Sequence, residues 1–103
     1  MGTFHKVAEV GELAPGSCKG VDVSGQQIAL FNIDGTYYAI GGTCTHRGGS
    51  LSEGTLEGTT ITCPLDGAEF DVTTGKNLTP PAPGSVPSYK VRIEGTQVQV
   101  EIP

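Results

Sequence analysis

Two short segments carry side chains that can bind a metal, and each sets two such side chains a few residues apart. Cys44 and His46 are separated by one residue in the first ligand segment (residues 44–51), and Cys63 and Asp66 by two in the second (residues 63–70). Glycines stand in or beside both segments, and glycine lets a backbone fold tightly around an ion or cluster. Iron and zinc accept thiolate, imidazole and carboxylate ligands. The two segments together predict one metal site.

The two ligand segments closely resemble the motifs of Rieske-type iron–sulfur proteins, C-x-H-x-G-x-x-L and C-x-x-H-G-x-x-F. In that family two cysteines hold one iron of a [2Fe–2S] cluster, and two histidines hold the other. At the position of the second histidine this sequence has Asp66. The other seven specified positions match, and they are Cys44, His46, Gly48, Leu51, Cys63, Gly67 and Phe70.

The resemblance implies that Cys44 and Cys63 bind one iron, and that His46 and Asp66 bind the other. A carboxylate in place of a neutral imidazole makes the cluster one charge more negative, so we expect a lower reduction potential. The aspartate side chain is also shorter than histidine, and a mononuclear or labile iron or zinc site and an empty site are the alternatives. The change at position 66 is either natural or engineered.

Residues beside the second ligand segment resemble those of soluble ferredoxins. In the high-potential respiratory members of the family, serine and tyrosine hydroxyls donate hydrogen bonds to the cluster sulfurs, and two extra cysteines form a disulfide. The corresponding residues here lack those groups, and they are Ala68 and Phe70, and Gly49 and Leu65. The sequence is similar to the ferredoxins that serve bacterial aromatic-ring dioxygenases.

This resemblance implies a one-electron carrier that shuttles electrons from a flavin-dependent NAD(P)H reductase to a terminal oxygenase, and not an enzyme. Two alternatives stay open. One is a degenerate Rieske-like or mononuclear metal-binding module with no role in electron transfer. The other is a structural domain stabilised by zinc, for which two cysteines, a histidine and an aspartate are an acceptable ligand set.

The elements that would position the ligand segments are strands. Alternating and β-branched patterns predict them at residues 3–10, 17–23, 27–33, 37–40, 59–62, 69–72, 89–93 and 97–102. Asp34-Gly35 favours a two-residue hairpin turn. No segment shows helical periodicity, so the fold class is all-β.

The resemblance covers nearly the whole chain and implies a Rieske-type antiparallel sandwich or barrel. It implies one domain of residues 1–103, with a small cluster-binding subdomain at about residues 41–83. Residues 78–87 contain four of the seven prolines, and by the same resemblance this segment forms a third loop that covers the cluster.

Chain length limits the size of the fold, and the number of cysteines bears on disulfide bonds. A chain of 103 residues makes one small domain. Three cysteines are an odd number and do not suggest a disulfide framework, so we expect the isolated Cys18 to be a small buried side chain. His5 is expected to be an exposed strand residue.

Charge and hydropathy bear on location and partners. No apolar run approaches the length of a membrane span and no signal sequence is recognisable, so we expect a cytoplasmic protein without membrane contact. Six basic against eleven acidic residues give a net charge of −5 without a basic cluster, which argues against nucleic acid as a partner. The acidic surface either serves solubility or steers docking onto a basic face of a redox partner.

Overall fold

The computed structural model describes residues 2–43, 50–65, 67–78 and 84–102, and this part of the chain is almost entirely β-structure. It contains one turn of 3-10 helix, η1 (Leu51–Glu53), and ten strands. The strands are β1 (Thr3–Glu9), β2 (Cys18–Val23), β3 (Gln26–Ile33), β4 (Thr36–Gly41), β5 (Thr55–Glu57), β6 (Thr60–Thr62), β7 (Glu69–Asp71), β8 (Ser88–Tyr89), β9 (Val91–Glu94) and β10 (Gln97–Ile102). The predicted all-β class is confirmed.

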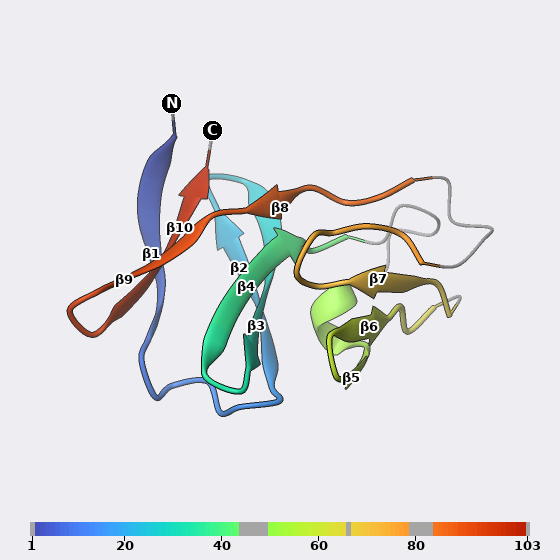
Figure 1. Ribbon diagram of the computed structural model, residues 1–103. Coiled ribbons are helices and arrows are strands. Elements are labelled where there is room, and N and C mark those ends of the chain that lie inside the picture. The colour runs from blue at the N-terminus through green and yellow to red at the C-terminus, as the bar shows by residue number, and fades with distance from the viewer. Residues whose placement is uncertain (1, 44–49, 66, 79–83, 103) are drawn as a thin grey trace.

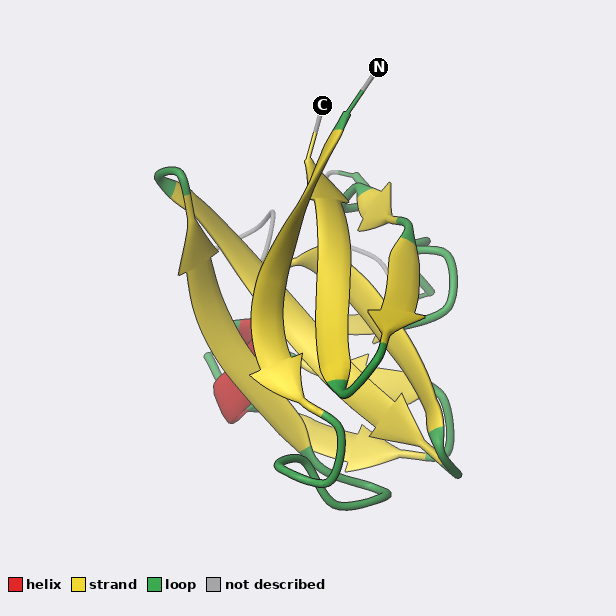
Figure 2. Ribbon diagram, turned by 90° about the vertical axis from the view of Figure 1, so that its left-hand side faces the viewer, coloured by secondary structure: helices red, strands yellow, loops and turns green. Residues whose placement is uncertain are grey.

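The strands form three antiparallel sheets (Figure 1), in the orders β1-β10-β9, β2-β3-β4-β8 and β5-β6-β7. The first two sheets make the larger part of the molecule. The third sheet lies beside the second together with η1. Seen from the side of the first sheet, β1 and β10 run next to each other and both termini leave at the same end (Figure 2). No helix in the described ranges is long and apolar enough to cross a membrane.

Strand β3 is the centre of the packing because it is buried on both of its faces. Ile28 and Leu30 point into the core between the first two sheets, together with Val98 and Val100 of β10. Ala29 and Phe31, on the opposite face, point into the core shared with the third sheet. Successive side chains of a strand alternate between faces, so an uninterrupted apolar run is what a strand between two cores requires.

The turn between β3 and β4 has the predicted geometry. Asp34 has φ of 51° and Gly35 has φ of 92°, and Ile33 pairs with Thr36 across the turn. Positive φ at both central residues is the type I′ arrangement, whose twist matches that of the flanking strands. The hairpin prediction is therefore confirmed.

The predicted strand 89–93 is wrong in one respect, because the chain changes sheets within it. Ser88 and Tyr89 pair with Ile40 and Ala39 of β4, in the second sheet. After Lys90 the chain leaves β4, and β9 pairs with β10 in the first sheet. An alternating pattern shows only that a segment is extended, and it does not show which neighbour the segment pairs with.

Three smaller features also differ from expectation. Turn η1 was not predicted, since three residues are too short to show a period. His5 is half-buried beside Val100 rather than fully exposed. Cys18 is only half-buried, packs against the core shared with the third sheet and donates a hydrogen bond from its thiol to the carbonyl oxygen of Ser52, at 3.1 Å.

The partial burial of Cys18 predicts a loss of stability in alkali. Burial raises the pKa of the Cys18 thiol above its ordinary value of 9.0. Above that pH the unfolded chain releases the proton more readily than the folded protein, so the stabilisation is complete below pH 9 and is lost as pH rises through the folded pKa. We expect the free energy of unfolding, measured by urea denaturation, to fall less steeply above pH 9 in Cys18→Ser. Equal slopes in both proteins would contradict this.

Candidate metal centre

Cys63 is the one predicted ligand that lies in the described part of the chain. It follows β6 directly and its side chain is only 2% exposed, in the core with Leu51, Ile61 and Phe70. Cys44, His46 and Asp66 lie outside the described residues. Within the described ranges no group of three or more histidine, cysteine or acidic side chains comes together. The four-residue ligand set therefore stays a prediction.

The second ligand segment begins with a tight turn. The backbone N–H of Cys63 donates to the carbonyl oxygen of Ala68 at 2.7 Å, and the N–H of Gly67 donates to the carbonyl oxygen of Cys63 at 3.1 Å. Gly67 has φ of 78°, a left-handed conformation that glycine adopts without steric cost. The turn joins β6 to β7, which pair through Ile61 and Phe70. Cys63 is thus fixed by strand pairing and by its own backbone bonds.

The two ends of the first ligand segment are held together at the end of β4. Thr43 and Ser50 form an antiparallel bridge, and the N–H of Leu51 donates to the carbonyl oxygen of Gly42 at 2.8 Å. The N–H of Gly42 in turn donates to the carbonyl oxygen of Gln27, also at 2.8 Å. Thr43 and Ser50, the described residues on either side of this stretch, therefore meet at one point beside the second sheet.

Turn η1 connects both ligand segments to the rest of the fold. On one side it lies against β2, where a Cβ atom added to Gly20 would be 2.6 Å from the Ser52 hydroxyl oxygen. On the other side, a Cβ atom added to Gly54 would collide with the carbonyl oxygen of Thr62, the residue before Cys63. Gly54 also donates its N–H to Leu51, at 3.0 Å. These contacts make the position of one ligand segment depend on that of the other.

The proline-rich segment 78–87 is anchored beside both ligand segments. Residues 79–83 lie outside the described part, but the residues after them are well connected. The N–H of Val86 donates to Gly75 at 2.9 Å, and the Pro87 carbonyl oxygen accepts the N–H of Gly41 at 2.8 Å. The Ser85 hydroxyl oxygen accepts the N–H of Asn77, at 2.8 Å. The segment thus returns to the end of β4, where the first ligand segment begins.

The surroundings of Cys63 suit a metal-bound thiolate. A charged thiolate in an apolar core is strongly disfavoured unless a positive ion compensates it, and the cysteine thiolate is the form that binds metals. The nearby Ala68 and Phe70 side chains are buried and carry no hydroxyl that could donate to a cluster sulfur. The environment fits a low-potential iron–sulfur centre.

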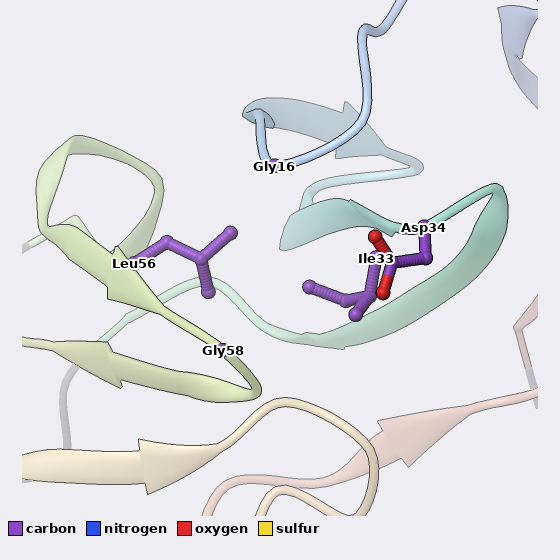
Figure 3. Close-up of a pocket in the computed structure, with 5 residues that line it drawn as sticks. All are labelled: Gly16, Ile33, Asp34, Leu56 and Gly58. Carbon is purple, nitrogen blue, oxygen red and sulfur yellow. The ribbon is translucent and has the colours of Figure 1, made fainter.

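A separate cavity of about 200 Å³ lies away from this centre (Figure 3). Its lining comes from three turns and strand ends, and consists of Gly16, Ile33, Asp34, Leu56 and Gly58. Cys63 follows the end of β6, whereas Gly58 is in the turn before that strand. The cavity therefore lies at the opposite end of the β5–β6 hairpin from the ligand.

Comparison with known proteins shows similarity along almost the whole chain. The profile of the Rieske [2Fe-2S] domain matches residues 3–90. The ferredoxin component of the naphthalene 1,2-dioxygenase system of Pseudomonas aeruginosa is 40% identical over 91 residues, which are 88% of each chain. The biphenyl dioxygenase ferredoxin subunit of Pseudomonas sp. strain KKS102 is 41% identical over 100 residues, 96% of this chain and 92% of the relative.

Solved structures show the same similarity. The ferredoxin of carbazole 1,9a-dioxygenase from Nocardioides aromaticivorans IC177 has a TM-score of 0.91 at 32% identity, covering 95% of this chain and 96% of that one. A complex of reduced oxygenase and oxidized ferredoxin in carbazole 1,9a-dioxygenase contains a chain with a TM-score of 0.90 at 33% identity, with 95% and 92% covered. The terminal oxygenase from the same Nocardioides strain reaches 0.86 at 28% identity, but only 30% of its chain is covered.

Proposed function

Since the chain belongs to the Rieske [2Fe-2S] domain family, we propose that it carries electrons on a [2Fe–2S] cluster held by Cys44, His46, Cys63 and Asp66. It is a ferredoxin-type electron carrier and not an enzyme, as its relatives are the ferredoxin components of dioxygenase systems. The similarity to curated relatives carries this conclusion. Ferredoxin components of two dioxygenase systems are 40% and 41% identical to the chain over 91 and 100 residues.

The residues of the chain hold and shield the group that changes oxidation state. When bound, the cluster supplies one-electron redox chemistry. Cys63 offers its thiolate from a buried position at the start of a hydrogen-bonded turn. We propose that Asp66 completes the ligand set as a carboxylate and lowers the reduction potential, and that residues 78–87 form a third loop over the cluster. Residues 41–83 then act as the cluster-binding part, for which the separate third sheet is the support.

We propose a flavin-dependent NAD(P)H reductase as the electron donor and the terminal oxygenase of an aromatic-ring dioxygenase system as the acceptor. The relatives are named for such systems, and the similar carbazole dioxygenase ferredoxin has been solved in complex with its oxygenase. Leu65 belongs to the second ligand segment, Leu78 donates its N–H to the carbonyl oxygen of Glu69 in the same segment, and the two leucines are 62% and 46% exposed. Exposed apolar side chains beside a redox centre suit a docking surface that partners cover. A cytoplasmic location belongs to this proposal.

Metal analysis of the purified protein tests the proposed cofactor. We expect about two irons and two acid-labile sulfides per chain, together with visible absorption that bleaches on reduction by one electron. The reductase should supply that electron in the presence of NAD(P)H, and at a rate that falls as salt screens the acidic surface. One zinc or one iron per chain without sulfide would overturn the cluster assignment.

A further inference from the structure

Figure 3 shows the residues that line the separate cavity of about 200 Å³. Ile33 and Leu56 point toward each other from β3 and β5, and the carboxylate of Asp34 lies on the same side as Ile33. Gly16 and Gly58 complete the lining from two turns. A Cβ atom at either glycine would meet nothing within 4 Å, so the space between the apolar walls is open.

The walls of this cavity are held in place by Asn32, a polar side chain that is only 4% exposed. Its amide nitrogen donates to the carbonyl oxygen of Leu13 at 2.7 Å, and its amide oxygen accepts the N–H of Gly35 at 2.8 Å. Its backbone carbonyl accepts the N–H of Gly16, at 2.7 Å. Asn32 thereby connects the 13–17 loop to the turn that carries Asp34. A cavity fixed in this way loses little entropy when it is filled.

The charge at the cavity is negative and is not compensated within the described part of the chain. The Asp34 side chain has no hydrogen-bond or ion-pair partner among the described residues. Other carboxylates already have a lysine partner. Glu9 and Glu12, for example, form ion pairs with Lys6 and Lys19. The Asp34 carboxylate thus stands beside an apolar slot.

We infer that this cavity receives an arginine or lysine side chain of the terminal oxygenase, an inference that rests on the proposed function. The aliphatic stem of such a side chain would lie between Ile33 and Leu56, and its charged head would reach Asp34, since long basic side chains bury their stems and keep their heads polar. The net charge of −5 favours a partner with a basic face. The oxygenase is the partner because a similar ferredoxin has been solved with its oxygenase.

The position of the cavity suits the rim of a docking surface centred on the metal site. Gly58 precedes Cys63 by five residues, of which Thr60–Thr62 form β6, so the two lie no more than roughly 16 Å apart at about 3.3 Å per residue. A typical interface covers about 800 Å² on each partner, which is a disc about 16 Å in radius. Charges at a rim act mainly on the association rate and its salt dependence, so that is where the effect should be measured.

The first experiment tests the cavity alone, with Nα-acetyl-arginine amide as the probe and the citrulline analogue as its uncharged control. In amide NMR spectra of the full chain, the arginine probe should shift Gly16, Gly35 and Gly58, and the citrulline probe should not. Asp34→Asn should lose the response, and Asn tolerates the left-handed φ at this position. Glu94→Gln removes the same charge from an exposed residue of β9 and should keep it. Equal responses to both probes, or no response, would overturn the inference.

The second experiment measures electron transfer to the oxygenase and from the reductase against salt concentration. Asp34→Asn should slow transfer to the oxygenase by about threefold at low salt, and the difference should vanish at high salt. Glu94→Gln should match the wild type. An effect of Asp34→Asn confined to the reductase, or an equal effect of Glu94→Gln, would overturn the inference. Failure of the wild-type protein to transfer electrons would instead count against the proposed function, because arginine binding does not depend on it.

Discussion

Replacing Asp66 by histidine is expected to raise the reduction potential by on the order of 150 mV. The change removes one negative charge from the proposed ligand set and restores the residue that the family has there. A unit charge about 4 Å away is worth roughly 4 kcal/mol at an effective dielectric constant of about 20. For one electron, a tenfold change in equilibrium corresponds to about 59 mV. The direction follows because reduction adds a negative charge, which a neighbouring carboxylate opposes.

Protein-film voltammetry of both proteins measures this shift. Glu57→Gln is the control, since it removes the same charge from a residue on β5 that is no proposed ligand, and its potential should change far less. Asp66→Ala should lower the iron and sulfide content, because it removes a ligand without a replacement. If Asp66→His left the potential where it was, the carboxylate would not be bound to iron.

Replacing Gly54 by alanine is expected to cost about 1–3 kcal/mol of stability, the usual range for overpacking a well-filled site, and most of the bound cluster. The new methyl group would collide with the carbonyl oxygen of Thr62, and a backbone atom in a paired strand cannot turn aside as a side-chain end can. Relief requires η1 to move away from β6. That movement separates the return of the first ligand segment from Cys63.

Urea denaturation and the ratio of visible absorbance to protein measure the two effects. Gly84→Ala is the matched control, because a Cβ atom at Gly84 would meet nothing within 4 Å and the same methyl group is added. Gly20→Ala should have a milder effect, since the atom it approaches is a side-chain hydroxyl that can rotate. Full cluster loading in Gly54→Ala would show that the two ligand segments are positioned independently.

Much of the fold could be predicted because its local signals agree with the final structure. Asp34-Gly35 fixes a type I′ turn by its own conformational preference. The uninterrupted apolar run at 28–31 indicates a strand that is buried on both faces. The alternation of apolar and polar residues in β10 indicates a strand that is buried on one face. The ligand motifs are equally local, which is why Cys63 could be placed in a loop directly after a strand.

The rest could not be predicted because it depends on contacts between segments far apart in the sequence. Nothing near Lys90 shows that β8 joins β4 whereas β9 joins β10. The contact of Gly20 with Ser52 has only a weak signal, a glycine in the middle of a strand, which often marks a close approach of another segment. Asn32 reads as an ordinary polar residue of a strand, and only the folded chain shows that it connects two walls of a cavity.

The pairing of β1 with β10 also sets an order of events during synthesis. Thr3 pairs with Ile102, so the first sheet cannot close until the last strand has left the ribosome, and contacts between such distant residues form slowly. The third sheet and η1, by contrast, are complete within residues 51–71. The strands that deliver Cys63 can thus pair with one another while the first sheet is still open.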